Sequence, residues 1–100
     1  MAKLTPKQRQ FLKAKAHTLK PLVQIGKAGA TPALVEELDR VLGVHELVKV
    51  KLNDNTFEDE AGVVAALTAE VDGLIHVWTI GHTLLLFRPS RERATRYPLP

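Results

Sequence analysis

Residues 20–35 read KPLVQIGKAGATPALV and contain the signals that decide the fold. Pro21 ends any helix before it, because proline cannot continue the helical hydrogen bonding and disfavours helix in the preceding residue. Residues 22–25 (LVQI), three of them apolar, predict a short buried strand. Thr31-Pro32 predicts the start of a helix, with threonine as the cap and proline at the first helical position. The stretch therefore predicts a strand that leads into a helix through a loop containing glycine.

Two helices are predicted around this stretch from apolar residues at helical spacing. The first should run from about Pro6 to His17, with Thr5 as its cap and Gln8 completing a capping box. The second follows the loop and should end at Gly43, since glycine is a common C-terminal stop.

A third helix is predicted between residues 56 and 71. Thr56 is its expected cap, and the acids at 58–60 suit the positive end of the helix dipole in the first turn. Asp72-Gly73 should end it.

Alternation of apolar and polar residues predicts three more strands. Residues 46–52 place Val48, Val50 and Leu52 on one face and Leu47, Lys49 and Lys51 on the other. Residues 74–80 and 83–88 should form a hairpin around Gly81-His82. The order α-β-α-β-α-β-β predicts an α/β (α+β) fold with a mixed four-stranded sheet packed with helices.

The chain has 100 residues, of which 45% are hydrophobic and 25% charged, and it contains no cysteine. This composition predicts one globular domain and excludes disulfides. No apolar run approaches the roughly 20 residues of a membrane span, and no apolar segment of a signal peptide follows the basic N-terminus. We therefore expect a soluble cytoplasmic protein that acts through its surface.

Charge is distributed unevenly along the chain. Residues 1–35 contain seven bases and no acid, residues 36–60 contain eight acids and three bases, and residues 88–100 contain four arginines and one acid. Such asymmetry is expected when one face binds a polyanion. The alternative is a solvated charged surface without a partner.

Catalysis is not predicted. There is no thiol, the only serine is Ser90 in an arginine-rich tail, and the four histidines lack the spacing of metal ligands. The acids at 58–60 are consecutive, so on a helix they point in different directions. We expect no enzyme activity, metal, cofactor or small-molecule substrate.

The loop Gly26-Lys27-Ala28-Gly29 is the most informative motif. Two glycines three residues apart allow a sharp turn and a close approach to a ligand, and a GxxG loop of this kind clamps the nucleic-acid backbone in KH modules. It lacks the spacing of a Walker loop or a dinucleotide fingerprint. An ordinary strand-to-helix turn is the alternative, but Lys27 and Lys20 concentrate positive charge around this one.

Trp78 is a second candidate. Simple alternation places Ile75, Val77 and Thr79 on one face of their strand and His76, Trp78 and Ile80 on the other. If the second face is the less buried one, the indole could stack on a base. Packing in the core or at an edge is the alternative.

Several motifs together resemble a known family. They are LTPKQR (4–9), Ala16-His17 with Leu19-Lys20-Pro21, IGKAG (25–29), HELVKVK (45–51), and Ile80-Gly81 followed by LFRP (86–89). In this order they resemble the CRM domain (chloroplast RNA splicing and ribosome maturation), most closely the stand-alone bacterial YhbY-type proteins, over residues 3–93. Many members have lysine where this chain has His82, and tyrosine where it has Phe87. The resemblance therefore does not imply a charge at position 82 or a hydroxyl contact at position 87.

The resemblance implies a KH-like RNA-binding fold related to the C-terminal domain of translation initiation factor 3. It also implies association with precursors of the large ribosomal subunit. The family's GxxG loop corresponds to residues 26–29, and its basic first helix corresponds to Lys7, Arg9, Lys13 and Lys15. We therefore expect a CRM domain over residues 1–93 and a loosely ordered tail over residues 94–100.

The predicted function is non-catalytic binding of ribosomal RNA by a monomer that assists large-subunit assembly and has no membrane partner. The predicted RNA-binding residues are Gly26, Lys27, Ala28, Gly29, Lys7, Arg9, Lys13, Lys15, Lys20, Lys49, Lys51, Arg88 and Arg91. One alternative is a protein-interaction module that uses the acidic middle of the chain. Another is a small RNA-modifying enzyme whose catalytic residues come from a partner.

Overall fold

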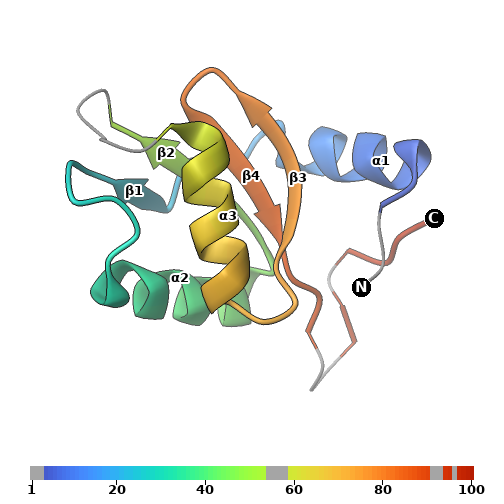
Figure 1. Ribbon diagram of the computed structural model, residues 1–100. Helices are drawn as coiled ribbons and strands as arrows, with labels where there is room; N and C mark the ends of the chain where they lie inside the picture. The colour runs from blue at the N-terminus through green and yellow to red at the C-terminus, as the bar shows by residue number, and fades with distance from the viewer. Residues whose placement is uncertain (1–3, 54–58, 91–93, 96) are drawn as a thin grey trace.

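The computed structural model describes residues 4–53, 59–90, 94–95 and 97–100. The elements within these ranges follow the predicted order (Figure 1). They are α1 (Pro6–Ala16), β1 (Val23–Ile25), α2 (Pro32–His45), β2 (Leu47–Leu52), α3 (Glu60–Glu70), β3 (Ile75–Ile80) and β4 (Thr83–Phe87). The fold is therefore the predicted mixture of three helices and a four-stranded mixed sheet in the described part of the chain.

The sheet has the strand order β1-β2-β4-β3. β1 pairs with β2 in parallel, and β4 pairs antiparallel with both β2 and β3. β2 and β3, which are joined through α3, thus point the same way with β4 inserted between them. The last strand of the sequence is a central strand of the sheet.

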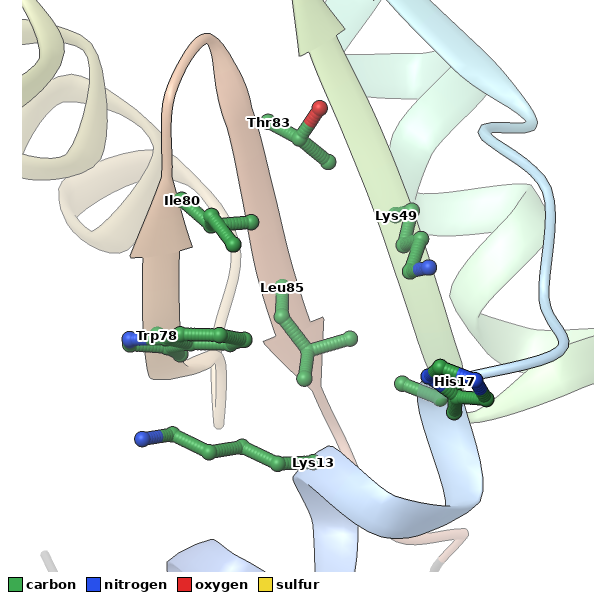
Figure 2. Close-up of a pocket in the computed structure, with 8 residues that line it drawn as sticks. Lys13, His17, Lys49, Trp78, Ile80, Thr83 and Leu85 are labelled. Carbon is green, nitrogen blue, oxygen red and sulfur yellow. The ribbon is translucent and has the colours of Figure 1, made fainter.

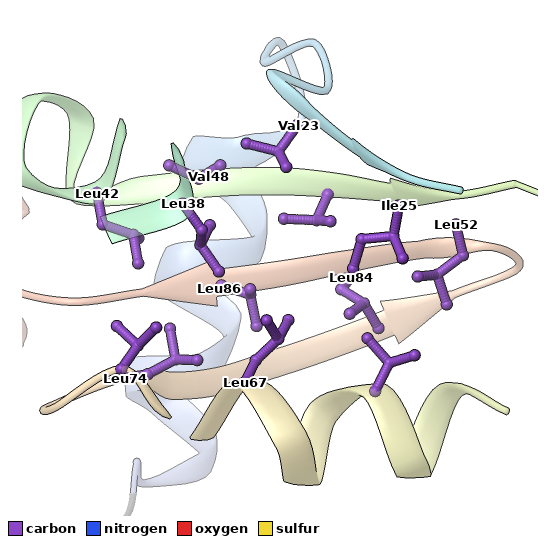
Figure 3. Packing of buried hydrophobic residues seen from close by; sticks show 13 residues of the cluster. Val23, Ile25, Leu38, Leu42, Val48, Leu52, Leu67, Leu74, Leu84 and Leu86 are labelled. Carbon is purple, nitrogen blue, oxygen red and sulfur yellow. The ribbon is translucent and has the colours of Figure 1, made fainter. Parts of the chain in front are cut away.

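Helices cover the sheet on both faces (Figure 1). α2 and α3 lie on one face, and α1 lies alone on the other. The larger core cluster fills the space between the sheet and α2 and α3; Figure 3 shows its side chains, among them Ile25, Leu38, Val48, Leu67 and Leu84. A smaller cluster under α1 comprises Leu12, Ala16, Leu47, Val77, Leu85 and Phe87. Val48, Val50 and Leu52 face the first cluster and Leu47 the second, as alternation along β2 predicted.

The ends of two helices differ from the prediction. α2 does not stop at Gly43 but continues to His45; it ends where Glu46 takes a positive φ (63°) and its N–H donates to the carbonyl of Leu42 at 2.9 Å. For α3 the expected cap, Thr56, lies outside the described residues. The helix is capped instead by Asp59, whose Oδ1 accepts the N–H of Gly62 at 2.7 Å. The capping box of Thr5 and Gln8 on α1 is confirmed.

The predicted alternation in β3 is wrong because the strand contains a bulge. The pairs are His76 with Leu86 and then Trp78 with Leu85, so Val77 is an extra residue in the ladder. Beyond the bulge each side chain changes face relative to simple alternation. Trp78 therefore lies on the same face as Val77, the side covered by α1. His76 and Thr79 share the opposite face, where Nε2 and Oγ1 are 2.6 Å apart.

The described tail residues contact the cluster under α1. The ring of Tyr97 meets that of Phe87 edge to face with centroids 6.2 Å apart, and Leu99 packs against the same cluster. The side-chain amide of Gln8 donates to the carbonyl of Pro100 at 3.3 Å. The division at residue 93 and the loose order of the tail stay predictions.

Candidate nucleic-acid interface

Side chains on the α1 face of the sheet form three rows across the strands. The first row is Leu47, Phe87 and Ile75, the second is Lys49, Leu85 and Trp78, and the third is Gln24, Lys51, Thr83 and Ile80. α1 covers the first row, where Leu47 and Phe87 are buried. The third row is largely open: Gln24, Lys51 and Ile80 are exposed, Ile80 by 55%. We call the second and third rows the open sheet face.

A hollow of about 210 Å³ lies between the end of α1 and the open sheet face. Figure 2 shows its walls, which are formed by Lys13, Ala16, His17, Lys49, Trp78, Ile80, Thr83 and Leu85. The ammonium of Lys13 lies 4.2 Å from the centroid of the Trp78 ring, a cation–π contact. The hollow thus has an aromatic wall and a basic rim.

Lys49 also holds the chain between α1 and β1. Its Nζ donates to the carbonyl of Leu19 at 3.0 Å, and the N–H of Leu22 donates to the carbonyl of Lys49 at 3.1 Å. Lys49 is half-buried as a result. It contributes positive charge to the rim of the hollow from a fixed position.

The glycine loop of residues 26–29 projects from the end of β1. The N–H of Gly29 donates to the carbonyl of Gly26 at 3.0 Å, and Gly29 has φ 71°, a conformation that side chains with a Cβ rarely adopt. Lys27 and Ala28 are exposed at the tip of the loop. The loop is therefore a tight turn that presents Lys27 and Ala28 outward, whereas Gly29 is buried.

The glycine loop lies at the same end of the sheet as the turn between β3 and β4. The N–H of Asn53 donates to the carbonyl of Ile25 at 2.9 Å, and the N–H of Leu52 donates to the carbonyl of His82 at 2.6 Å. The third row crosses the sheet just before these contacts. A strand of nucleic acid could therefore contact the loop and the open sheet face together.

The exposed bases of α1 and the exposed acids of α2 and α3 lie on opposite sides of the sheet. α1 contains no acid, and none of the residues of the open sheet face or of the hollow is acidic. The exposed carboxylates of Glu36, Asp39 and Glu70 lie on α2 and α3, on the opposite side of the sheet. The basic side is accordingly the side suited to a polyanion.

The structure brings together some of the predicted site residues. Lys49 and Lys51 belong to the open sheet face, and Lys13 lies beside it on α1. Lys27 lies in the glycine loop. Lys7, Lys15 and Lys20 are exposed on α1 and just after it. The ammonium of Lys15 lies 5.5 Å from the ring centroid of Phe11.

Three predicted arginines are placed differently. The guanidinium of Arg9 donates to the carbonyls of His76 and Val77 at the bulge of β3, so it is engaged within the fold. Arg88 donates to the carboxylate of Asp39 at 2.5 Å and to its carbonyl at 2.8 Å, which holds it on the α2 side of the sheet. Arg91 lies outside the described residues.

His76 lies next to the Arg9 contact, facing α3. Partial burial lowers the pKa of its imidazole from the usual 6.5, and the positive charge of Arg9 lowers it further. At neutral pH the ring is therefore uncharged, which suits its contact with the hydroxyl of Thr79.

Sequence reasoning missed the hollow and the row that leads to it. Gln24, Thr83 and Ile80 belong to the open sheet face, and His17 lines the hollow, yet none was predicted as a site residue. Alternation in β1 could have indicated Gln24. The bulge that aligns Trp78 with Leu85 has no comparable local signal.

No helix in the described ranges is long and apolar enough to cross a membrane. No group of three or more histidine, aspartate or glutamate side chains there could hold a metal ion.

The fold and the site define a small α+β domain with a glycine loop and a basic, partly uncovered sheet face. The model of the CRS1/YhbY (CRM) domain matches residues 4–88, and the chain belongs to this family. It is 40% identical over 98 residues to a Haemophilus influenzae protein named "RNA-binding protein", covering 98% of both chains. It is 38% identical over 89 residues to the Bacillus subtilis protein named "Probable RNA-binding protein YqeI", covering 89% of this chain and 92% of the relative.

A solved structure has the same fold. The solution structure of SAV1595 from Staphylococcus aureus, described as a candidate RNA-binding protein, superposes with a TM-score of 0.79 at 32% sequence identity. The match covers 98% of this chain and 100% of that one. It confirms the fold that the resemblance implied.

Proposed function

We propose that the protein is a non-catalytic RNA-binding factor that contacts ribosomal RNA through the glycine loop and the open sheet face. As a cytoplasmic monomer, it assists assembly of the large ribosomal subunit. The names of its relatives support the RNA-binding part of this proposal. The resemblance to YhbY-type proteins supports the ribosomal part.

One observation carries the proposal. The glycine loop lies at the end of the sheet where the third row of the open sheet face crosses it with Lys51, and neither the loop nor this row contains an acid. Phosphate contacts supply most of the affinity in nucleic-acid binding, and the backbone of a glycine turn can approach a phosphate closely. The arrangement offers both kinds of contact to one strand.

The loop is best tested at Ala28, which is exposed and free of the φ restriction at Gly29. Ala28→Asp places a carboxylate where a phosphate would approach, whereas Ala28→Asn adds the same volume without charge. We expect the aspartate variant to bind a large-subunit RNA fragment at least tenfold more weakly, since it adds repulsion at a phosphate contact. The asparagine variant should stay close to the unmodified protein.

The titration uses a labelled RNA fragment at two salt concentrations, with circular dichroism as a check on folding. Equal affinities of the two folded variants, both close to that of the unmodified protein, would remove the loop from the interface. Salt-independent binding of the unmodified protein would contradict the phosphate contacts themselves.

The assembly role is tested by sedimentation of cell extracts at low salt, because high salt strips factors held by charge. We expect the protein in fractions that contain large-subunit precursors and not in those of translating ribosomes. Its presence only in ribosome-free fractions, with intact precursors in the gradient, would favour a protein-interaction module that uses the acidic side.

A further inference from the structure

The hollow beside Trp78 has the features of a small binding site. Its inner walls are apolar, formed by Ala16, Leu85 and the indole of Trp78, while its rim carries Lys13 and Lys49. Trp78 is 38% exposed although it is the largest side chain of the sheet, because the bulge turns it onto the half that α1 leaves uncovered.

Size and shape restrict the occupant to something small and flat. Sites that bury a whole small molecule commonly measure about 300–1,000 Å³, and this hollow measures about 210 Å³. Figure 2 shows the indole edge-on, with Lys13 on one side of the ring and Ile80 on the other. A single aromatic ring system reaches the indole face beside Leu85 once the flexible side chain of Lys13, whose ammonium lies 4.2 Å from the ring centroid, moves aside.

Charge restricts the occupant further. The rim lysines and Lys51 in the neighbouring row favour an occupant that is attached to a negatively charged polymer. No acid lines the hollow. A nucleobase on a phosphodiester backbone has both properties, a flat apolar face and adjacent negative charge.

We propose that the hollow receives one unstacked base of a single-stranded RNA segment, which packs against the indole of Trp78 while Lys13 and Lys51 hold the neighbouring phosphates. This inference rests on the proposed function and names the class of RNA that the site accepts. A base inside a duplex is stacked and paired and cannot enter, so the site selects RNA with an unpaired nucleotide.

The third row gives the strand its path. Gln24, Lys51, Thr83 and Ile80 lie side by side across the sheet, between the hollow and the end that carries the glycine loop. An RNA strand clamped at the loop would reach the hollow along this row, none of whose residues is acidic.

Trp78 is the only tryptophan of the chain, so indole fluorescence reports on this site alone. The experiment compares three labelled ligands of equal length: a single-stranded oligoribonucleotide, the same strand in a duplex, and a single strand without bases. Anisotropy of the label measures binding, and quenching of Trp78 measures stacking.

We expect the single strand with bases to quench Trp78 at saturation, and the other two ligands to bind without quenching. Trp78→Ala should weaken binding of the single strand by about tenfold, as for other stacked bases, and leave the strand without bases unaffected. Trp78→Phe, which keeps an aromatic face, should restore most of the affinity. Lys13→Met removes charge and should weaken binding of all three ligands.

Binding of the single strand without quenching would overturn the base site and leave the proposed function standing. Equal losses by Trp78→Ala for strands with and without bases would do the same. If the alanine variant does not fold, the quenching comparison in the unmodified protein decides alone. If none of the three ligands binds, the proposed function is overturned together with the base site.

Discussion

The guanidinium of Arg9 on α1 donates hydrogen bonds to the carbonyls of His76 and Val77, where the register of β3 against β4 shifts. A bulge interrupts the ladder and leaves backbone groups in need of other partners. Arg9 supplies one partner from the helix packed above. The contact therefore couples the position of α1 to the bulge that turns Trp78 onto the open sheet face.

Replacing Arg9 should destabilise the fold. We expect Arg9→Met to lower the free energy of unfolding by about 1–3 kcal/mol, because charge-assisted hydrogen bonds to two carbonyls are lost. Urea denaturation measures this change, and the emission of Trp78 should shift as the bulge relaxes. Lys7→Met, at an exposed base on the same helix, is the control and should have little effect. Equal stability of the two variants would show that the Arg9 contact contributes nothing to folding.

The imidazole of His76 should make stability depend on pH. Burial and Arg9 lower its pKa in the folded protein below the usual 6.5, so the unfolded chain binds the proton more readily. Stability contributed by the neutral ring is present above pH 6.5 and is lost as the pH falls toward the folded pKa. His76→Gln should flatten the dependence of the unfolding free energy on pH between about 7 and 5. An unchanged slope would exclude His76 as its source.

Glu46 joins the end of α2 to the segment after β4. Its buried carboxylate accepts the N–H of Ser90 at 3.1 Å and the hydroxyl of Thr95 at 2.5 Å. Glu46→Ala leaves these donors without their acceptor and should cost about 1–3 kcal/mol of stability. Glu46→Gln keeps one acceptor oxygen and should cost less. Denaturation of both variants tests this order. If Glu46 acted only through its positive φ, the two variants would lose similar stability.

Lys51 and Arg40 offer a matched comparison of the two sides of the sheet. Both are exposed bases, Lys51 on the open sheet face and Arg40 on α2. Lys51→Gln should weaken RNA binding and reduce the slope of log affinity against log salt by about 1, since one phosphate contact is lost. Arg40→Gln changes net charge equally and should have a much smaller effect. Similar losses would show that net charge, not the open sheet face, governs binding.

The elements could be predicted from sequence because their signals are local. Thr5 with Gln8 and Thr31 with Pro32 mark helix starts through contacts within one turn, and the glycine of the 81–82 turn has the expected positive φ. Alternation in β2 assigned its lysines to the correct face. The predicted element order and mixed sheet followed from these signals.

What sequence could not supply depends on residues distant in the chain. Arg9 was predicted as an RNA contact from its charge and from the resemblance, and its hydrogen-bond partners within the fold lie 67 and 68 residues away. Arg88 likewise pairs with Asp39 across the molecule. The bulge at Val77 has the same origin, because register is set by pairing with β4 and not by the sequence of β3 alone. Gly43 predicted the end of α2, but the helix continues to His45 and ends at Glu46, whose φ is positive.

The central position of β4 has a consequence for how the chain acquires its structure during synthesis. β3 and one edge of β2 obtain their ladder partner only from residues 83–87. A nascent chain that has not yet exposed these residues can pair only β1 with β2. Both the bulge and the hollow beside Trp78 thus form only after residues 83–87 have left the ribosome, since pairing with β4 defines them.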